Sequence, residues 1–116
     1  MIIEIYQITG ENCITQEDGE DVYNKIHPAL LKGEEKVELD FNNVKVFAST
    51  FFNQSIGRLL EDIAPKTLNE LLSFSNLSEI GDSVLRKVID NAKRYYSDPN
   101  FKKAHDETMS ERLNDV

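Results

Sequence analysis

Histidine and cysteine side chains are the first candidates for chemistry in this sequence, and both are rare. His27 and His105 lie far apart along the chain, and neither has a partner at the spacing of a metal site. Cys13 lies in a polar stretch without a basic neighbour that would lower its pKa. We therefore expect no metal, no catalytic thiol and no cofactor.

Glycine and acidic residues do not form a recognisable site either. The glycines stand apart instead of forming a phosphate-binding loop. The acidic clusters EDGED (17–21) and GEEK (33–36) lack the spacing of a calcium loop. With no catalytic constellation in view, we expect that the protein is not an enzyme.

Two adjacent hydroxyl residues, Ser49 and Thr50, precede an apolar helical stripe. A hydroxyl at a helix start accepts a hydrogen bond from a first-turn amide and stabilises the helix by about 1 kcal/mol. One residue suffices as the cap, so we expect Ser49 to cap and Thr50 to present its hydroxyl at the surface. The helix terminus would tolerate a phosphate there. On the residues alone, a cap without a switch is the simpler interpretation.

Alternating strands and helices must position these residues. We expect strands at 2–8, 36–41 and 71–75, and helices at 21–33, 49–63 and 76–98. In the second strand Val37, Leu39 and Phe41 share the buried face, and Pro65 ends the second helix. This order predicts an α/β fold with a small, mostly parallel sheet covered by helices.

The C-terminus has the pattern of one further helix. Asp98 and Pro99 are typical of an N-cap followed by proline at the first helical position. The apolar stripe behind them is thin: Phe101, His105, Met109 and Leu113. We therefore expect a domain at 1–97 and a helical tail at 98–116 that is dispensable for folding.

The second helix has a face outside its apolar stripe, formed by Phe51, Gln54, Ser55 and Arg58. An aromatic residue beside a small residue and an arginine is typical of an interface anchor. We expect these residues to bind a partner. The alternative is that Phe51 packs under the neighbouring third helix, at 76–98, or under a loop.

Composition limits the kind of partner. The chain has 116 residues, of which 40% are hydrophobic, and a formal net charge of −8. A negative field repels phosphate backbones and anionic lipids, so we expect neither nucleic acid nor a membrane as partner. No apolar run approaches the ~20 residues of a membrane span. One cysteine fits a reducing compartment, and we expect a cytoplasmic protein that binds proteins.

The segment VELDFNNVKVFASTFFNQSIGRLLED (37–62) and the order of elements resemble the STAS fold of anti-sigma-factor antagonists. The resemblance is closer still to the bacterial STAS-like domains of unknown function, and it extends from about Met1 to Tyr96. In the antagonists, an Asp-Ser-Ser-Gly motif opens the second helix, and a histidine-kinase-like ATPase phosphorylates its second serine. That motif falls on residues 48–51, where Ala48 and Phe51 replace the acidic residue and the glycine.

The resemblance implies a regulatory protein–protein interaction module. Its partner would be a histidine-kinase-like ATPase or another regulator, bound through the N-terminus of the second helix. The resemblance places the phosphorylation switch at Thr50, with Ser49 as the second candidate. The alternative is a STAS-type domain that binds a nucleotide or another anionic ligand at the same helix N-terminus. Whether the protein forms a homodimer is left open.

Overall fold

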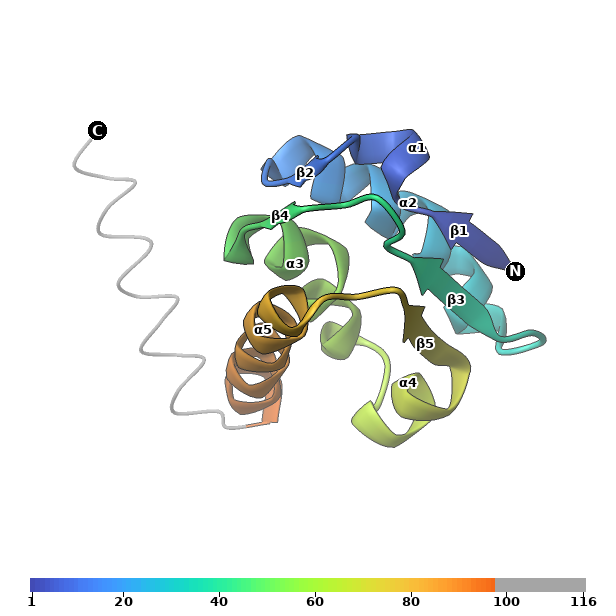
Figure 1. The fold of residues 1–116 in the computed structure, drawn as a ribbon. Helices are drawn as coiled ribbons and strands as arrows, with labels where there is room; N and C mark the ends of the chain where they lie inside the picture. The colour runs from blue at the N-terminus through green and yellow to red at the C-terminus, as the bar shows by residue number, and fades with distance from the viewer. Residues whose placement is uncertain (98–116) are drawn as a thin grey trace.

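Three parallel strands form the main sheet of the computed structural model, which describes residues 1–97 (Figure 1). They are β1 (Ile2–Glu4), β3 (Val37–Asp40) and β5 (Leu72–Ser75), in the order β1-β3-β5. Their register aligns Ile3, Leu39 and Phe74 across the sheet. The parallel sheet confirms the predicted α/β fold, whereas the predicted C-terminal helix lies outside the described residues.

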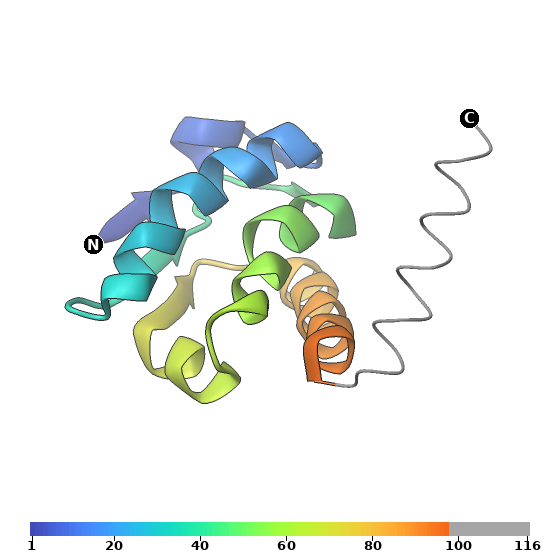
Figure 2. The same ribbon diagram turned by 180° about the vertical axis from the view of Figure 1, so that it is seen from behind.

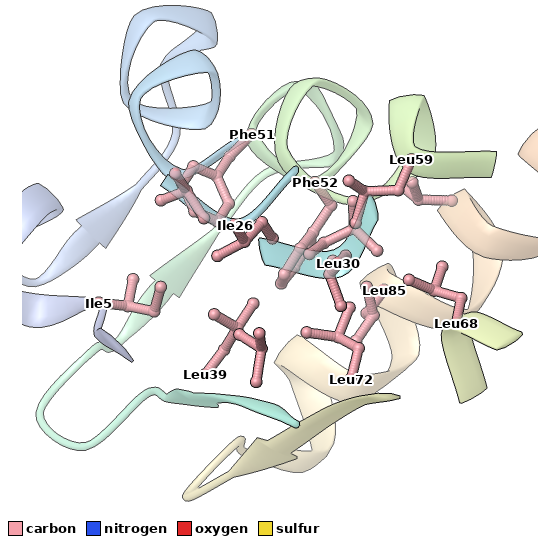
Figure 3. Close-up of a cluster of buried hydrophobic side chains, with 14 of the residues drawn as sticks. Ile5, Ile26, Leu30, Leu39, Phe51, Phe52, Leu59, Leu68, Leu72 and Leu85 are labelled. Carbon is pink, nitrogen blue, oxygen red and sulfur yellow. The ribbon is translucent and has the colours of Figure 1, made fainter. Parts of the chain in front are cut away.

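The buried face of the sheet is the one that α2 covers. Val37 and Leu39 are buried on this side, and Figure 3 shows Ile26 and Leu30 of α2 in the same core as Leu39. Glu38 and Asp40 alternate with them and are half-buried on the opposite face. In Figure 1 that face lies toward the viewer, and no described helix covers it. The sequence left open whether helices cover one or both faces.

Helix α2 (Gln16–Lys32) begins earlier than the predicted start at Asp21. Thr15 is its N-cap, because the Thr15 side chain accepts a hydrogen bond from the Asp18 amide at 3.1 Å. The helix continues through Pro28 and ends at Gly33, whose φ of 67° needs glycine. The polar first turn is mostly exposed, so apolar periodicity alone does not reveal it.

The polar stretch before α2 is not only a turn. It contains α1 (Tyr6–Thr9) and the short strand β2 (Asn12–Cys13), which pairs in parallel with β4 (Val46–Phe47). Figure 1 shows β2 and β4 side by side, apart from the main sheet. Cys13 is buried in the core beneath this second sheet.

The predicted helix at 49–63 is in fact two elements. Helix α3 (Ser49–Ser55) is followed by a 3₁₀ helix, η1 (Gly57–Glu61). The sequence pattern does not predict α4 (Pro65–Leu71), because Pro65 indicates only the end of the preceding helix. Proline equally suits the first turn of a new helix, because its missing amide needs no partner there.

The last described helix, α5 (Glu79–Ser97), falls within the predicted range 76–98. Its buried residues are Gly81, Leu85, Val88 and Ala92. The apolar Ile80 is 72% exposed, and Val84 is only partly buried. Figure 2 shows α5 beside η1 and α3, and these contacts select the inward face.

Candidate functional site

The candidate site is the start of α3, directly after β4. The Ala48 amide donates a hydrogen bond to the Cys13 carbonyl oxygen at 2.9 Å, which continues the β2–β4 ladder by one residue. Ala48 itself is extended, with φ −126° and ψ 147°, and the helix begins at Ser49. Both Ser49 and Thr50 are exposed. The strand therefore presents the two hydroxyl residues at the surface.

The expected cap at Ser49 is wrong. Ala48 occupies the N-cap position, and no side chain accepts a hydrogen bond from the first turn of α3. Ser49 is already helical, so its hydroxyl is not placed to accept from an amide two or three residues later. The first turn of α3 thus keeps its partial positive charge without a side-chain acceptor among the described residues.

Phe51 is not a surface anchor, contrary to our expectation. It is 1% exposed, and its ring meets the Phe52 ring edge to face with 5.4 Å between centroids. Figure 3 shows both rings pointing into the core beside Ile26 of α2. The alternative was right that Phe51 is buried, but the helix beside it in Figure 3 is α2 and not the third helix of the prediction.

Gln54, Ser55 and Arg58, the other residues of the predicted partner-binding face, lie where α3 and η1 pack on α2. Ser55 is fully buried, and its hydroxyl donates to the Phe51 carbonyl oxygen at 2.9 Å. Gln54 and Arg58 are half-buried. The Arg58 guanidinium lies 4.0 Å from the centroid of the Tyr23 ring and donates to Gln54 Oε1 at 3.4 Å. As a contact surface for a partner, this face is largely occupied by the chain's own α2.

A second cluster, which the sequence did not reveal, continues this contact. The ring of His27 stacks on Tyr23 with 4.6 Å between centroids, and His27 Nε2 lies 2.8 Å from Asp62 Oδ2. Burial raises the pKa of Tyr23, and Arg58 opposes this effect. His27 and Asp62 are 35 residues apart, so no local spacing pointed to the pair. Arg58 lies in η1 and Asp62 directly follows it, so the Arg58–Tyr23 and the Asp62–His27 contacts both join α2 to η1.

Two exposed apolar side chains lie at the β2–β4 sheet: Ile14, which directly follows β2, and Val46 of β4. Cys13 points inward, so the next residue, Ile14, points outward. Phe47 packs against Phe41 and Phe52, so Val46 also points outward. Ile14 is 42% and Val46 45% exposed. We call Ile14, Val46, Ser49 and Thr50 the β4–α3 surface.

Cys13 offers no nucleophile. Burial raises the pKa of its thiol from 9.0 to about 11, although the Thr9 hydroxyl, 3.4 Å from Sγ, acts in the opposite direction. At neutral pH the thiolate is therefore a negligible fraction. Within residues 1–97, no group of three or more His, Cys, Asp or Glu is placed to hold a metal ion. The helices of the same region are all too short or too polar to cross a membrane.

The fold and the exposed helix start define a small α/β domain of the STAS-like class. The family model of the STAS-like domain of unknown function (DUF4325) matches residues 18–82, more than half of the chain. The chain therefore belongs to this family of STAS-like domains. Neither a curated protein nor a solved structure matches it.

Proposed function

We propose that this STAS-like domain is a non-enzymatic regulatory module that binds a protein partner through the β4–α3 surface. The observation that carries the proposal is the position of Thr50. It is exposed at the start of α3, which directly follows the β2–β4 sheet with its outward-facing Ile14 and Val46. Exposed aliphatic side chains next to hydrogen-bonding groups are the composition of a protein interface.

The partner we propose is a histidine-kinase-like ATPase, or a regulator that takes its place. The family membership and the position of Thr50 in the STAS motif support this class of partner. In this proposal the partner contacts Ile14 and Val46, whereas Phe51 supports α3 from inside the core. The anchor residues thus differ from those that the sequence suggested.

Phosphorylation of Thr50 is the proposed switch. A phosphate adds a charge of nearly −2, and the first turn of α3 has no side-chain cap that competes for its amides. The fold would therefore tolerate the modification. A partner that covers Val46 would not, because the charge would have to be desolvated beside an apolar contact.

The test compares Thr50→Glu with a matched control, Thr67→Glu. Thr67 is also exposed and lies in the first turn of α4, so both substitutions place a carboxylate near a helix N-terminus. We expect both variants to melt within a few degrees of the wild type, because the charge is favourable by ~0.3–1 kcal/mol there. With a purified partner recovered from the native host, Thr50→Glu and Val46→Asp should weaken binding by about tenfold or more.

Thr67→Glu should bind like the wild type. Equal binding of Thr50→Glu, Val46→Asp and wild type would refute the proposed surface. Phosphorylation itself is read by mass spectrometry after incubation with the partner and ATP, with Thr50→Val and Ser49→Ala as the two site controls. Incorporation that persists in Thr50→Val but not in Ser49→Ala would move the switch to Ser49.

The uncapped first turn also supports the second candidate, a nucleotide or another anion bound at the start of α3. A thermal-shift series with nucleotides and inorganic phosphate separates the two. A rise in melting temperature that grows with ligand concentration and disappears in Thr50→Glu would favour the ligand-binding domain. No shift at millimolar ligand would favour the protein partner.

A further inference from the structure

The outer face of the main sheet, opposite the face that α2 covers, carries two rows of side chains across the three strands. The register gives the members of these rows, which are Ile2, Glu38 and Ser73 in the first and Glu4, Asp40 and Ser75 in the second. The Ser75 hydroxyl donates a hydrogen bond to Glu38 Oε2 at 3.0 Å, so these two side chains lie on the same face. We call the six residues the outer sheet face.

An open face is unusual for a sheet of this kind. Sheets with only parallel strands are normally covered on both faces, because their crossover connections place helices there. In this protein α2 lies across the inner face, and no helix within residues 1–97 covers the outer one (Figures 1 and 2). Ile2 is 66% exposed as a result. The outer sheet face therefore offers the kind of surface that a helix occupies in other parallel sheets.

The charge of this face limits what can cover it. Its three charged side chains, Glu4, Glu38 and Asp40, are all acidic. Lys36, which directly precedes β3, lies at the opposite end of that strand from Asp40. A second copy of the chain, docked through the same face, would bring carboxylates against carboxylates at a cost in free energy. A cationic partner is complementary to the face.

The dimensions of the face match a single helix. Neighbouring strands lie about 4.8 Å apart, so the two outer strands are ~10 Å apart, close to the ~10–12 Å diameter of a helix with its side chains. Glu38 and Asp40 are two residues apart on β3, which corresponds to ~6.6 Å. Residues i and i+4 of a helix are ~6 Å apart along its axis. A helix that lies along the strands thus places one basic residue on each row.

We propose that the outer sheet face binds one amphipathic helix of a partner protein, with lysine or arginine at positions i and i+4. The two cations contact Glu38 and Asp40, and an apolar flank of the helix covers Ile2. Ser73 and Ser75 are small, so β5 leaves room for the helix. The inference goes beyond the proposed function. The outer sheet face shares no residue with the β4–α3 surface, so failure of one proposal leaves the other intact.

A synthetic peptide tests the face directly. The probe is a helix of about four turns, made of leucine, alanine and lysine, with its lysines at i and i+4. Titrated into the full-length protein and followed by NMR, it should shift the Ile2 methyl groups and the amides of Glu38 and Asp40. A peptide of the same composition with its lysines at i and i+2 should bind more weakly by about fivefold or more, because these lysines do not share one helix side.

Two double variants separate this face from the net charge of the protein. Glu4→Gln/Glu38→Gln should weaken binding of the first peptide by about tenfold. The control, Glu17→Gln/Asp21→Asn, removes two exposed carboxylates from α2 and changes the net charge equally. It should bind within about twofold of the wild type, because distant exposed charges are screened by salt.

Four results would overturn the proposal. Equal weakening in the two double variants would mean that net charge alone attracts the peptide. Shifts confined to residues outside the two rows would place the contact elsewhere. In the free protein, nuclear Overhauser cross-peaks from the Ile2 methyl groups to residues beyond Ser97 would assign the face to the chain's own C-terminal segment. Shifts of the same methyl groups that grow with protein concentration would assign it to a second copy. The wild-type measurements decide the question even where a double variant is poorly folded.

Discussion

At the scale of single residues, Asp40 shows how the exposed sheet face is ordered. Its Oδ1 accepts hydrogen bonds from Asn76 Nδ2 and from the Asn42 amide, each at 2.9 Å. These bonds, chiefly the one from Asn76, hold the pKa of the Asp40 carboxyl below its ordinary value of 3.8. Because the folded-state pKa is lowered, this group stabilises the fold above its unfolded-state pKa. That stabilisation is lost as the pH falls through the folded-state pKa.

Asn76→Gly should therefore raise the pKa of Asp40 toward its ordinary value and reduce the acid dependence of stability. Glycine suits the site, because Asn76 has a φ of 55°. Asn43→Gly is the matched control, since Asn43 has a φ of 70° and makes no such bond to Asp40. NMR titration of the Asp40 carboxyl measures both. An unchanged pKa in Asn76→Gly would mean that the Asn42 amide alone sets it.

Thr15, the observed N-cap of α2, differs from Ser49, the predicted cap of α3, in what its hydroxyl bonds. Thr15→Ala should lower the free energy of unfolding by about 1 kcal/mol, because the Asp18 amide loses its acceptor. Ser49→Ala should change it by less than about 0.5 kcal/mol, because the Ser49 side chain caps nothing. Urea denaturation measures both changes. A loss in Ser49→Ala as large as that in Thr15→Ala would restore Ser49 as the cap.

At the scale of elements, the packing of α2 on α3 depends on Gly19. A Cβ at Gly19 would lie 2.7 Å from the Phe51 carbonyl oxygen and 2.8 Å from Gln54 Cβ. The first of these is backbone, which cannot move without shifting α3. A Cβ at Gly57, the first residue of η1, would meet only side chains: Val88 at 3.4 Å and Ala92 at 3.7 Å on α5, and Asn53 of α3 at 3.7 Å. The close backbone approach therefore occurs at Gly19.

Gly19→Ala should lower the free energy of unfolding by roughly 1–3 kcal/mol, the usual cost of overpacking. Gly57→Ala is the control, because its Cβ would make ordinary contacts. That variant should be neutral or more stable by up to about 1 kcal/mol, since alanine restricts the unfolded chain. Chemical denaturation measures the free energy of unfolding of both variants. Equal effects in both variants would show that α3 shifts freely relative to α2.

At the scale of the whole molecule, the described residues already contain a continuous core. Side chains from α2, β3, α3, η1, α4, β5 and α5 belong to one buried cluster. Val37, Leu39 and Phe41, which the sequence predicted to share a buried face, lie in it.

Truncation after Asp98 should therefore leave a cooperative fold. The denaturation midpoint should fall only modestly, because the described residues form one buried cluster without that segment. Circular dichroism and urea titration of the truncated chain measure both properties. Loss of cooperative unfolding would place the C-terminal segment in the core and move the domain boundary beyond residue 97.

The sequence by itself determined the features that depend on local pattern. The alternation of Val37, Leu39 and Phe41 defined a strand and its buried face. The succession of strands and helices defined the α/β class, and the segment 37–62 indicated the STAS-like family. The exposure of Thr50 was predicted too, although its premise, a cap at Ser49, was wrong.

Only the tertiary structure decided which neighbour covers each apolar face. Periodicity shows that Phe51 belongs to a helix, but the helix that buries it passes at Gly19, far earlier in the chain. The contact between His27 and Asp62 was likewise not predictable from local spacing, because the two residues are 35 positions apart in the sequence. On α5, Gly81 and Leu85 are buried instead of Ile80 and Val84, because α3 and η1 pack against that side of the helix. Such choices depend on contacts distant in sequence, which local spacing does not encode.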